Sequence, residues 1–183
     1  YLPTTRSSFI ITQNRDEHYS RPHALPPQVY NHNGVNLVYP KDPTGSGTWM
    51  CASESRVICL LNGAFGPHIF FPPYKKSRGL VVLESFNSGN AYQFASEYDF
   101  SGIEPFTMIW LQKQVSDTRL FRGIKHEWEL YEIKWDGKER YHSQHDAATG
   151  QIWSSAMLYN NEMHEQRKIW WQNWMRAEIK KLP

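Results

Sequence analysis

Short apolar runs separated by polar turns dominate the first third of the chain and predict β-strands. The predicted strands are Ser8–Thr12, Val35–Tyr39, Thr48–Ala52 and Arg56–Leu61. The last two are close enough to form a hairpin that turns at Glu54-Ser55. Between the first two, Pro22, Pro26 and Pro27 interrupt the stretch from Arg21 to Asn36, which we expect to be an irregular connection.

Helical spacing appears in two places. From Ser77 to Phe100 the apolar residues recur at helical intervals but are interrupted by Asn87–Asn90, which predicts two short helices. Near the end, Asn160 or Asn161 can cap a helix that carries Glu162 in its first turn and Lys180 and Lys181 in its last. Its apolar stripe consists of Met163, Trp170, Trp174 and Ala177. We expect this stripe to pack against another surface.

Between the helices lie further strand patterns, at Phe106–Gln112, Thr118–Arg122 and His126–Trp135. In the last of these, Tyr131, Ile133 and Trp135 would share one face of the sheet. Asp136-Gly137 then carries the signal of a type I′ hairpin turn. Strands, a helical pair, more strands and a closing helix predict an α+β protein rather than an alternating βαβ fold.

Composition narrows the class of protein. A length of 183 residues with 40% hydrophobic residues predicts one globular domain over 1–183. The net charge is only +2 and the basic residues are scattered, which argues against nucleic acid as a partner. The longest uncharged stretch, Val57–Tyr74, contains prolines and glycines and does not predict a membrane span, so we expect no integral membrane association. Nothing indicates secretion, and we expect a cytoplasmic protein.

Generic catalytic motifs are absent from the sequence. Gly45–Thr48 lacks the lysine of a phosphate-binding loop, and His142 and His145 are expected to be solvated on a surface turn, so we predict no metal site. Cys51 and Cys59 would point to opposite faces of the predicted hairpin and are expected to be free, buried thiols. The chain starts at Tyr1, almost directly with a strand, and we expect that a few residues of the fold precede it.

Four motifs in a fixed order carry a family resemblance. They are NRDEHYSRP (Asn14–Pro22), GSGTW (Gly45–Trp49), RVICLLNG (Arg56–Gly63) and SRGL (Ser77–Leu80). A weaker fifth segment, WSSAMLY, begins at Trp153. Together they closely resemble the NRDE family, which includes the Transport and Golgi organisation 2 proteins. In the fifth segment Ser155 stands where the family has an asparagine.

The resemblance implies an N-terminal-nucleophile hydrolase-like fold, a four-layer αββα sandwich, with a Met-Cys start a few residues ahead of the first strand. Removal of the Met would make Cys the N-terminal nucleophile, whose α-amino group can take the thiol proton. Arg15 would then stabilise the thiolate, Asp16 orient the amino group and Asn62 donate to the oxyanion. The remaining expected substrate contacts are Asn14, Glu17, Trp49 and Ser155.

Neighbouring side chains of an extended strand point in opposite directions. Arg15 would therefore share a pocket with Glu17, and Asn14 with Asp16, unless the strand ends or bulges here.

The predicted function is hydrolysis or transfer of an acyl group from an amide or thioester of a small molecule, without a cofactor. The resemblance also allows an alternative, a non-catalytic carrier of haem or a lipid, in which His18 or Tyr19 would touch the ligand. A purely structural module is the third reading, and the oligomeric state is open.

Overall fold

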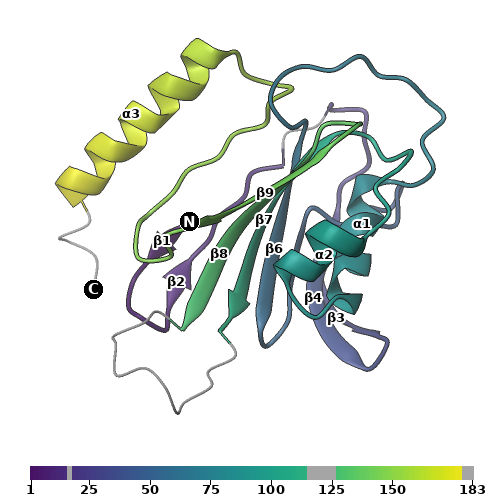
Figure 1. The fold of residues 1–183 in the computed structure, drawn as a ribbon, viewed down its shortest axis with the longest axis horizontal. Helices are drawn as coiled ribbons and strands as arrows, with labels where there is room; N and C mark the ends of the chain where they lie inside the picture. Colours follow the sequence, from purple (N-terminus) through teal and green to yellow (C-terminus); the bar gives the residue numbers. More distant parts are fainter. Residues whose placement is uncertain (16–17, 115–126, 179–183) are drawn as a thin grey trace.

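A computed structural model describes residues 1–15, 18–114 and 127–178 of the chain. Its centre is a seven-stranded antiparallel sheet with the strands in the order β3-β4-β5-β6-β7-β8-β9 (Figure 1). The strands are β3 (Leu25–His32), β4 (Val35–Lys41), β5 (Met50–Ala52), β6 (Arg56–Asn62), β7 (Phe106–Lys113), β8 (Trp128–Trp135) and β9 (Arg140–His145). The sheet is therefore a meander in which neighbours in sequence are neighbours in space.

The central strands β6 and β7 form the core because both of their faces are covered. Ile58 pairs with Trp110 on one face and Cys59 with Ile109 on the other, and all four side chains are buried. Burial on both faces explains why these strands read as continuous apolar runs rather than as alternating ones.

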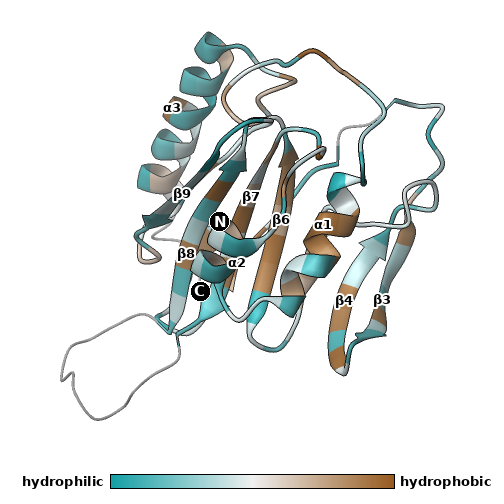
Figure 2. Ribbon diagram, turned by 45° about the vertical axis from the view of Figure 1, so that its right-hand side comes forward, coloured by the Kyte–Doolittle hydropathy of each residue, from teal (hydrophilic) through white to brown (hydrophobic). Residues whose placement is uncertain are grey.

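Helices α1 (Arg78–Glu84) and α2 (Ala91–Glu97), joined by a single 3₁₀ turn (Ser85–Asn87), cover one face of the sheet (Figure 2). The Ser77 hydroxyl accepts a hydrogen bond from the Gly79 N–H, and the Asn90 side chain accepts one from the Gln93 N–H, so both helices begin at side-chain caps. Phe94 of α2 is fully buried against Trp110 of β7. The two predicted helices and the break between them are confirmed.

The opposite face of the sheet is covered by different elements. A two-stranded sheet of β1 (Leu2–Pro3) and β2 (Phe9–Ile10) packs there on a smaller cluster around Cys59 and Leu130. The segment after β9 then returns over this face and leads into α3 (Asn161–Glu178), the outermost element (Figure 1). The predicted capping of α3 is confirmed, because the Asn160 side chain accepts a hydrogen bond from the Met163 N–H at 2.9 Å.

The predicted irregular connection over Arg21–Asn36 was wrong, because it contains strand β3. Pro26 and Pro27 are compatible with this strand since β3 is at the edge of the sheet, where a missing N–H breaks no interior ladder. The pairing with β4 is irregular between Leu25 and Gln28, where the two prolines lie.

The predicted turn after Trp135 differs from the structure in detail. The hairpin between β8 and β9 is present, but Trp135 pairs with Arg140, so the loop has four residues instead of the two of a type I′ turn. The Asp136 carboxylate accepts hydrogen bonds from the Lys138 and Glu139 N–H groups and so stabilises the longer loop. The predicted strand Thr118–Arg122 lies outside the described residues.

The apolar stripe of α3 is not its packed side. Met163, Trp170 and Trp174 are exposed, whereas a neighbouring face of the helix packs through Trp171, whose indole N–H donates to the Gly150 carbonyl at 3.3 Å. Helical spacing identified the apolar residues correctly but could not tell which side of the helix meets the body.

His142 and His145 lie within β9 instead of on a turn, opposite Ile133 and Leu130 respectively. His142 contacts Tyr92 of α2, and His145 contacts Trp153 on the other side, so the two imidazoles lie on opposite faces of the sheet. Cys51 and Cys59 are likewise buried in the clusters on opposite faces, as predicted.

Candidate functional site

A cavity of about 150 Å³ opens where five segments meet. These are the stretch after β2, the loop between β4 and β5, the end of β6, the start of α1 and the segment between β9 and α3. The residues around it are Gln13, Asn14, Arg15, Arg21, Asp42, Gly47, Thr48, Trp49, Leu60, Leu61, Asn62, Ser77, Arg78, Gly79, Ser155 and Leu158. The motifs that are scattered over the sequence thus meet around one cavity.

Two glycines allow the backbones at this cavity to touch. A Cβ on Gly47 would lie 2.3 Å from the carbonyl carbon of Gly79, a separation that real atoms do not reach. A Cβ on Gly79 would lie 2.9 Å from the Thr48 nitrogen, whose N–H donates to the Gly79 carbonyl at 3.1 Å. The glycines of GSGTW and SRGL therefore fix the distance between the β4–β5 loop and α1.

Charged groups gather on the side of the cavity formed by the β4–β5 loop. The Arg15 guanidinium carbon lies 4.8 Å from the centroid of the Trp49 ring, and its Nη2 lies 3.8 Å from the Asp42 carboxylate. Arg21 forms a shorter ion pair with the same carboxylate. Stacking on an indole and pairing with a carboxylate restrict the orientation of Arg15.

Asp42 is mostly buried, with 13% of its side chain exposed. Burial alone would raise its pKa, but the hydrogen bond from Arg21 and those from the Thr44 and Gly45 N–H groups outweigh it and hold the pKa below its usual value. The carboxylate is therefore ionised at neutral pH and acts as a counter-ion for the guanidinium groups of the cavity.

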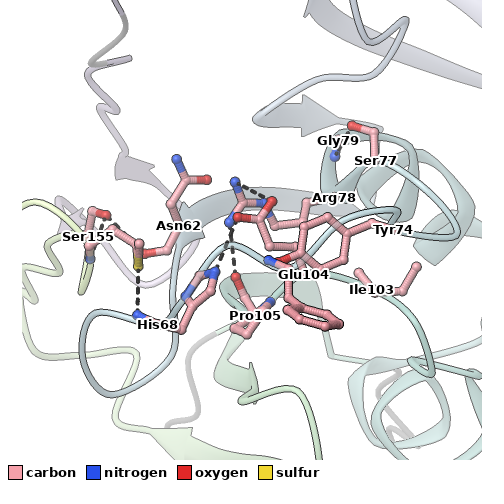
Figure 3. A network of polar contacts seen from close by, with 12 residues as sticks. Asn62, His68, Tyr74, Ser77, Arg78, Gly79, Ile103, Glu104, Pro105 and Ser155 are labelled. Atoms are coloured by element: carbon pink, nitrogen blue, oxygen red, sulfur yellow. Dashed lines mark hydrogen bonds and ion pairs between the residues drawn. The ribbon is translucent and has the colours of Figure 1, made fainter.

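Asn62 lies at the end of β6, where the strand leaves the sheet. The Ser155 hydroxyl donates to its backbone carbonyl at 2.9 Å and accepts from the Met157 N–H at 3.2 Å (Figure 3). Ser155 is 8% exposed. Its hydroxyl therefore ties the segment after β9 to the end of β6, which positions Asn62.

A network of polar contacts lies behind Arg78, which borders the cavity. The Arg78 guanidinium contacts the Glu104 carboxylate at 3.1 Å and donates to the Pro105 carbonyl at 3.1 Å. Glu104 also contacts the imidazole of His68 at 3.2 Å, and the His68 N–H points to the Met157 sulfur (Figure 3). This network joins the loop after β6 to the start of α1.

Five of the predicted site residues lie together around the cavity. They are Asn14, Arg15, Trp49, Asn62 and Ser155. Asp16 and Glu17 lie outside the described residues. His18 and Tyr19, expected at a bound haem or lipid in the alternative reading, do not border the cavity, and Tyr19 is fully exposed.

Sequence reasoning missed Arg21, Asp42 and Arg78 as residues of the cavity. Arg21 and Arg78 are part of the motifs NRDEHYSRP and SRGL, so their place in the motifs was a usable signal. Asp42 belongs to none of the motifs, and only the folded chain brings it next to Arg15 and Arg21.

Neither cysteine in the described chain borders this cavity. Burial raises the pKa of the Cys51 thiol to about 12, and it raises the pKa of the Cys59 thiol to about 12 as well. Thiols with such pKa values are protonated at neutral pH and are poor nucleophiles. We therefore assign both cysteines to the core.

The structure defines a mixed α/β protein in which a large antiparallel sheet, covered by helices, positions an arginine-lined cavity at the end of its central strands. The model of the Transport and Golgi organisation 2 family matches residues 3–176, and the chain belongs to that family. The match includes every residue placed around the cavity. No curated protein matches the chain.

Proposed function

We propose that the protein is a cysteine N-terminal-nucleophile hydrolase or acyltransferase that acts on an amide or thioester. Its nucleophile would precede Tyr1 and lie beside Arg15. The observation that supports this proposal is the register of β1 and β2. Continued backwards, this register would lead the chain ahead of Tyr1 toward the cavity.

Leu2 pairs with Ile10 and Pro3 with Phe9 in antiparallel register. Continued backwards, this register sets the residues before Tyr1 beside Thr12, Gln13, Asn14 and Arg15 in turn, at about 3.3 Å per residue. A strand extended by four residues would thus reach Arg15. A nucleophile a few residues ahead of the first strand satisfies this geometry.

The neighbourhood of Ile11–Asn14 supports such an extension. Among the described residues, no backbone-to-backbone hydrogen bond joins this stretch to another segment, so its donors and acceptors are available for a neighbouring strand. A second cavity of about 300 Å³ runs along it, bordered by Tyr1, Ile11, Cys59 and Ile109, and it shares Gln13 and Asn14 with the first cavity. We propose that the added strand would enter this second cavity.

The order of the layers supports an N-terminal-nucleophile hydrolase-like fold. α1 and α2 lie on one side of the large sheet, and β1–β2 followed by α3 lie on the other (Figure 1). A helix layer, a sheet, a second smaller sheet and a helix agree with a four-layer αββα sandwich. We propose that β1–β2 is part of the second sheet of that sandwich.

In the proposed reaction, the α-amino group of the N-terminal cysteine removes the thiol proton, and the thiolate adds to the substrate carbonyl. Arg15 favours the thiolate through its positive charge, and the side-chain N–H of Asn62 donates to the oxyanion. The C–N or C–S bond breaks, and the ammonium group returns its proton to the leaving amine or thiol. Water, or another acceptor, then attacks the thioester and releases the acyl group and the free cysteine.

The role of Arg15 is tested by the rate at which iodoacetamide alkylates the N-terminal cysteine in the protein expressed from its full reading frame. Arg15→Ala should slow alkylation at neutral pH by roughly 3- to 10-fold, because loss of a nearby cation raises a thiol pKa by up to about one unit. Arg176→Ala, which removes an exposed arginine from α3, is the matched control and should leave the rate unchanged. Equal rates in the two variants would contradict the assignment of Arg15.

The role of Asn62 is tested separately with p-nitrophenyl acetate. Asn62→Ala should leave alkylation by iodoacetamide unchanged, because alkylation forms no oxyanion. It should slow acylation of the cysteine, followed by intact mass, by about 100-fold, the usual effect of losing one oxyanion donor. Acylation at the parent rate would rule out Asn62 as that donor.

A further inference from the structure

The loop between β6 and α1 exposes a continuous group of large apolar side chains. Ile69 is 87% exposed, Phe70 64% and Phe71 81%. No Asp, Glu, Lys or Arg occurs in the loop before Lys75. Figure 2 shows the loop arching beyond the end of the sheet, with its middle in brown. Exposed apolar groups of this kind mark a surface that binds another apolar surface.

The inner side of the same loop is fixed to the body of the protein. His68 points inward and contacts Glu104, which in turn contacts Arg78 of α1 (Figure 3). The Phe71 N–H donates to the Tyr74 hydroxyl at 2.9 Å, and the Phe70 and Tyr74 rings are in edge-to-face contact. The apolar side chains are therefore presented by an anchored loop.

The backbone of the loop leaves few N–H groups without a partner. Pro67, Pro72 and Pro73 have no N–H group. The N–H groups of His68 and Phe71 have partners within the protein. Between Pro67 and Pro73 only Ile69 and Phe70 have N–H groups without a recorded partner, so moving this stretch out of water leaves few donors unsatisfied.

We propose that Ile69, Phe70 and Phe71, here called the apolar tip, insert into the surface of a lipid bilayer. The tip projects outward, and a bilayer accepts a projecting apolar group without the complementary groove that a protein partner would need. Among the described residues, no helix is long and apolar enough to cross a membrane, so the tip would hold the protein at the membrane surface.

Membrane docking would bring the candidate site close to the lipid. The loop starts at Asn62 and ends at Ser77 and Arg78, all of which border the cavity. The inference rests on the loop alone and does not depend on the proposed reaction.

Flotation with vesicles of phosphatidylcholine tests the proposal. The parent protein should float with the vesicles. The triple variant Ile69→Ser, Phe70→Ser, Phe71→Ser should show a partition coefficient lower by about tenfold or more, because each large apolar side chain that enters the bilayer favours binding through the apolar area that it buries. The matched control is Met163→Ser, Ile169→Ser, Trp170→Ser, which removes three exposed apolar side chains from α3 and should still float. All six side chains are exposed, so both variants should keep the parent's circular dichroism and thermal midpoint.

A second measurement places the tip itself. An environment-sensitive nitrobenzoxadiazole label on Ile69→Cys should gain intensity and shift to shorter wavelength when vesicles are added. Cys51 and Cys59 are buried and should remain unlabelled. The parent protein, labelled in the same way, is the control for the cysteine proposed ahead of Tyr1, and only the signal that Ile69→Cys adds is read as that of the tip. The proposal is overturned if the parent does not float, if the tip variant floats as well as the parent, if the α3 variant loses binding equally, or if the label does not respond. It is also overturned if the parent is an oligomer that the tip variant dissociates in the absence of lipid, because the tip would then be a protein interface.

Discussion

Replacement of Gly47 by alanine tests how the cavity is assembled. The new Cβ would lie 2.3 Å from the carbonyl carbon of Gly79 and 2.6 Å from the Leu80 nitrogen, and all of these atoms belong to backbone. Ordinary contacts start near 3.4 Å, so the β4–β5 loop and α1 must separate by about 1 Å. Overpacking costs about 1–3 kcal/mol, and loss of the hydrogen bond from Thr48 to Gly79 adds about 1 kcal/mol. We expect a loss of about 2–4 kcal/mol.

Urea unfolding followed by circular dichroism measures this loss, and thermal unfolding should show a midpoint lower by roughly 5–15 °C. Gly66→Ala is the matched control, because a Cβ on Gly66 would meet open space. Its free energy of unfolding should stay within about 0.5 kcal/mol of the parent value. If Gly47→Ala were as stable as Gly66→Ala, the close contact between the loop and α1 would be refuted.

Three further substitutions test other parts of the structure. Arg56→Met should lower the free energy of unfolding by about 2 kcal/mol in urea, because the buried guanidinium donates to the Ser85 and Gly89 carbonyls and stacks on Trp110; an unchanged midpoint would contradict this. Ser155→Ala should lower the free energy of unfolding by about 1 kcal/mol in the same assay, because it removes the hydrogen bond from the Ser155 hydroxyl to the Asn62 carbonyl. An unchanged free energy of unfolding would show that this hydrogen bond does not contribute to stability. Asp42 has a lowered pKa in the folded state. Its contribution to the free energy of unfolding is therefore fully present above the pKa of the unfolded state, about 3.9, and is lost as the pH falls through the pKa of the folded state. Asp42→Asn should therefore be less stable than the parent near pH 7, with the difference shrinking toward about pH 3, and parallel pH profiles would refute the ion pairs of this carboxylate.

The sequence predicted those elements whose pattern is set by local burial. The strands β6 and β7 and the two short helices follow directly from their apolar spacing and caps. Strand β3 was missed because its prolines are tolerated only at a sheet edge, and which strand is at the edge is a property of the whole sheet. The packed side of α3 was missed for a similar reason, since contacts with Gly150 decide it.

The candidate site was predicted in part. Motifs identified Arg15, Trp49, Asn62 and Ser155, and the fold brings these residues to one cavity. Asp42 could not be found in this way, because its importance comes from two arginines that reach it from distant positions in the chain. Local patterns indicate which residues are unusual, whereas the pairing of charges depends on the fold.

The central claim is that the chain ahead of Tyr1 places a reactive cysteine beside Arg15. Peptide mapping of the protein expressed from its full reading frame, after brief treatment with a limiting amount of iodoacetamide at neutral pH, tests it most directly. The account predicts an unblocked N-terminal cysteine that is alkylated far faster than Cys51 and Cys59, both of which are buried. Absence of such a cysteine, or a thiol there that reacts no faster than these two, would contradict the claim.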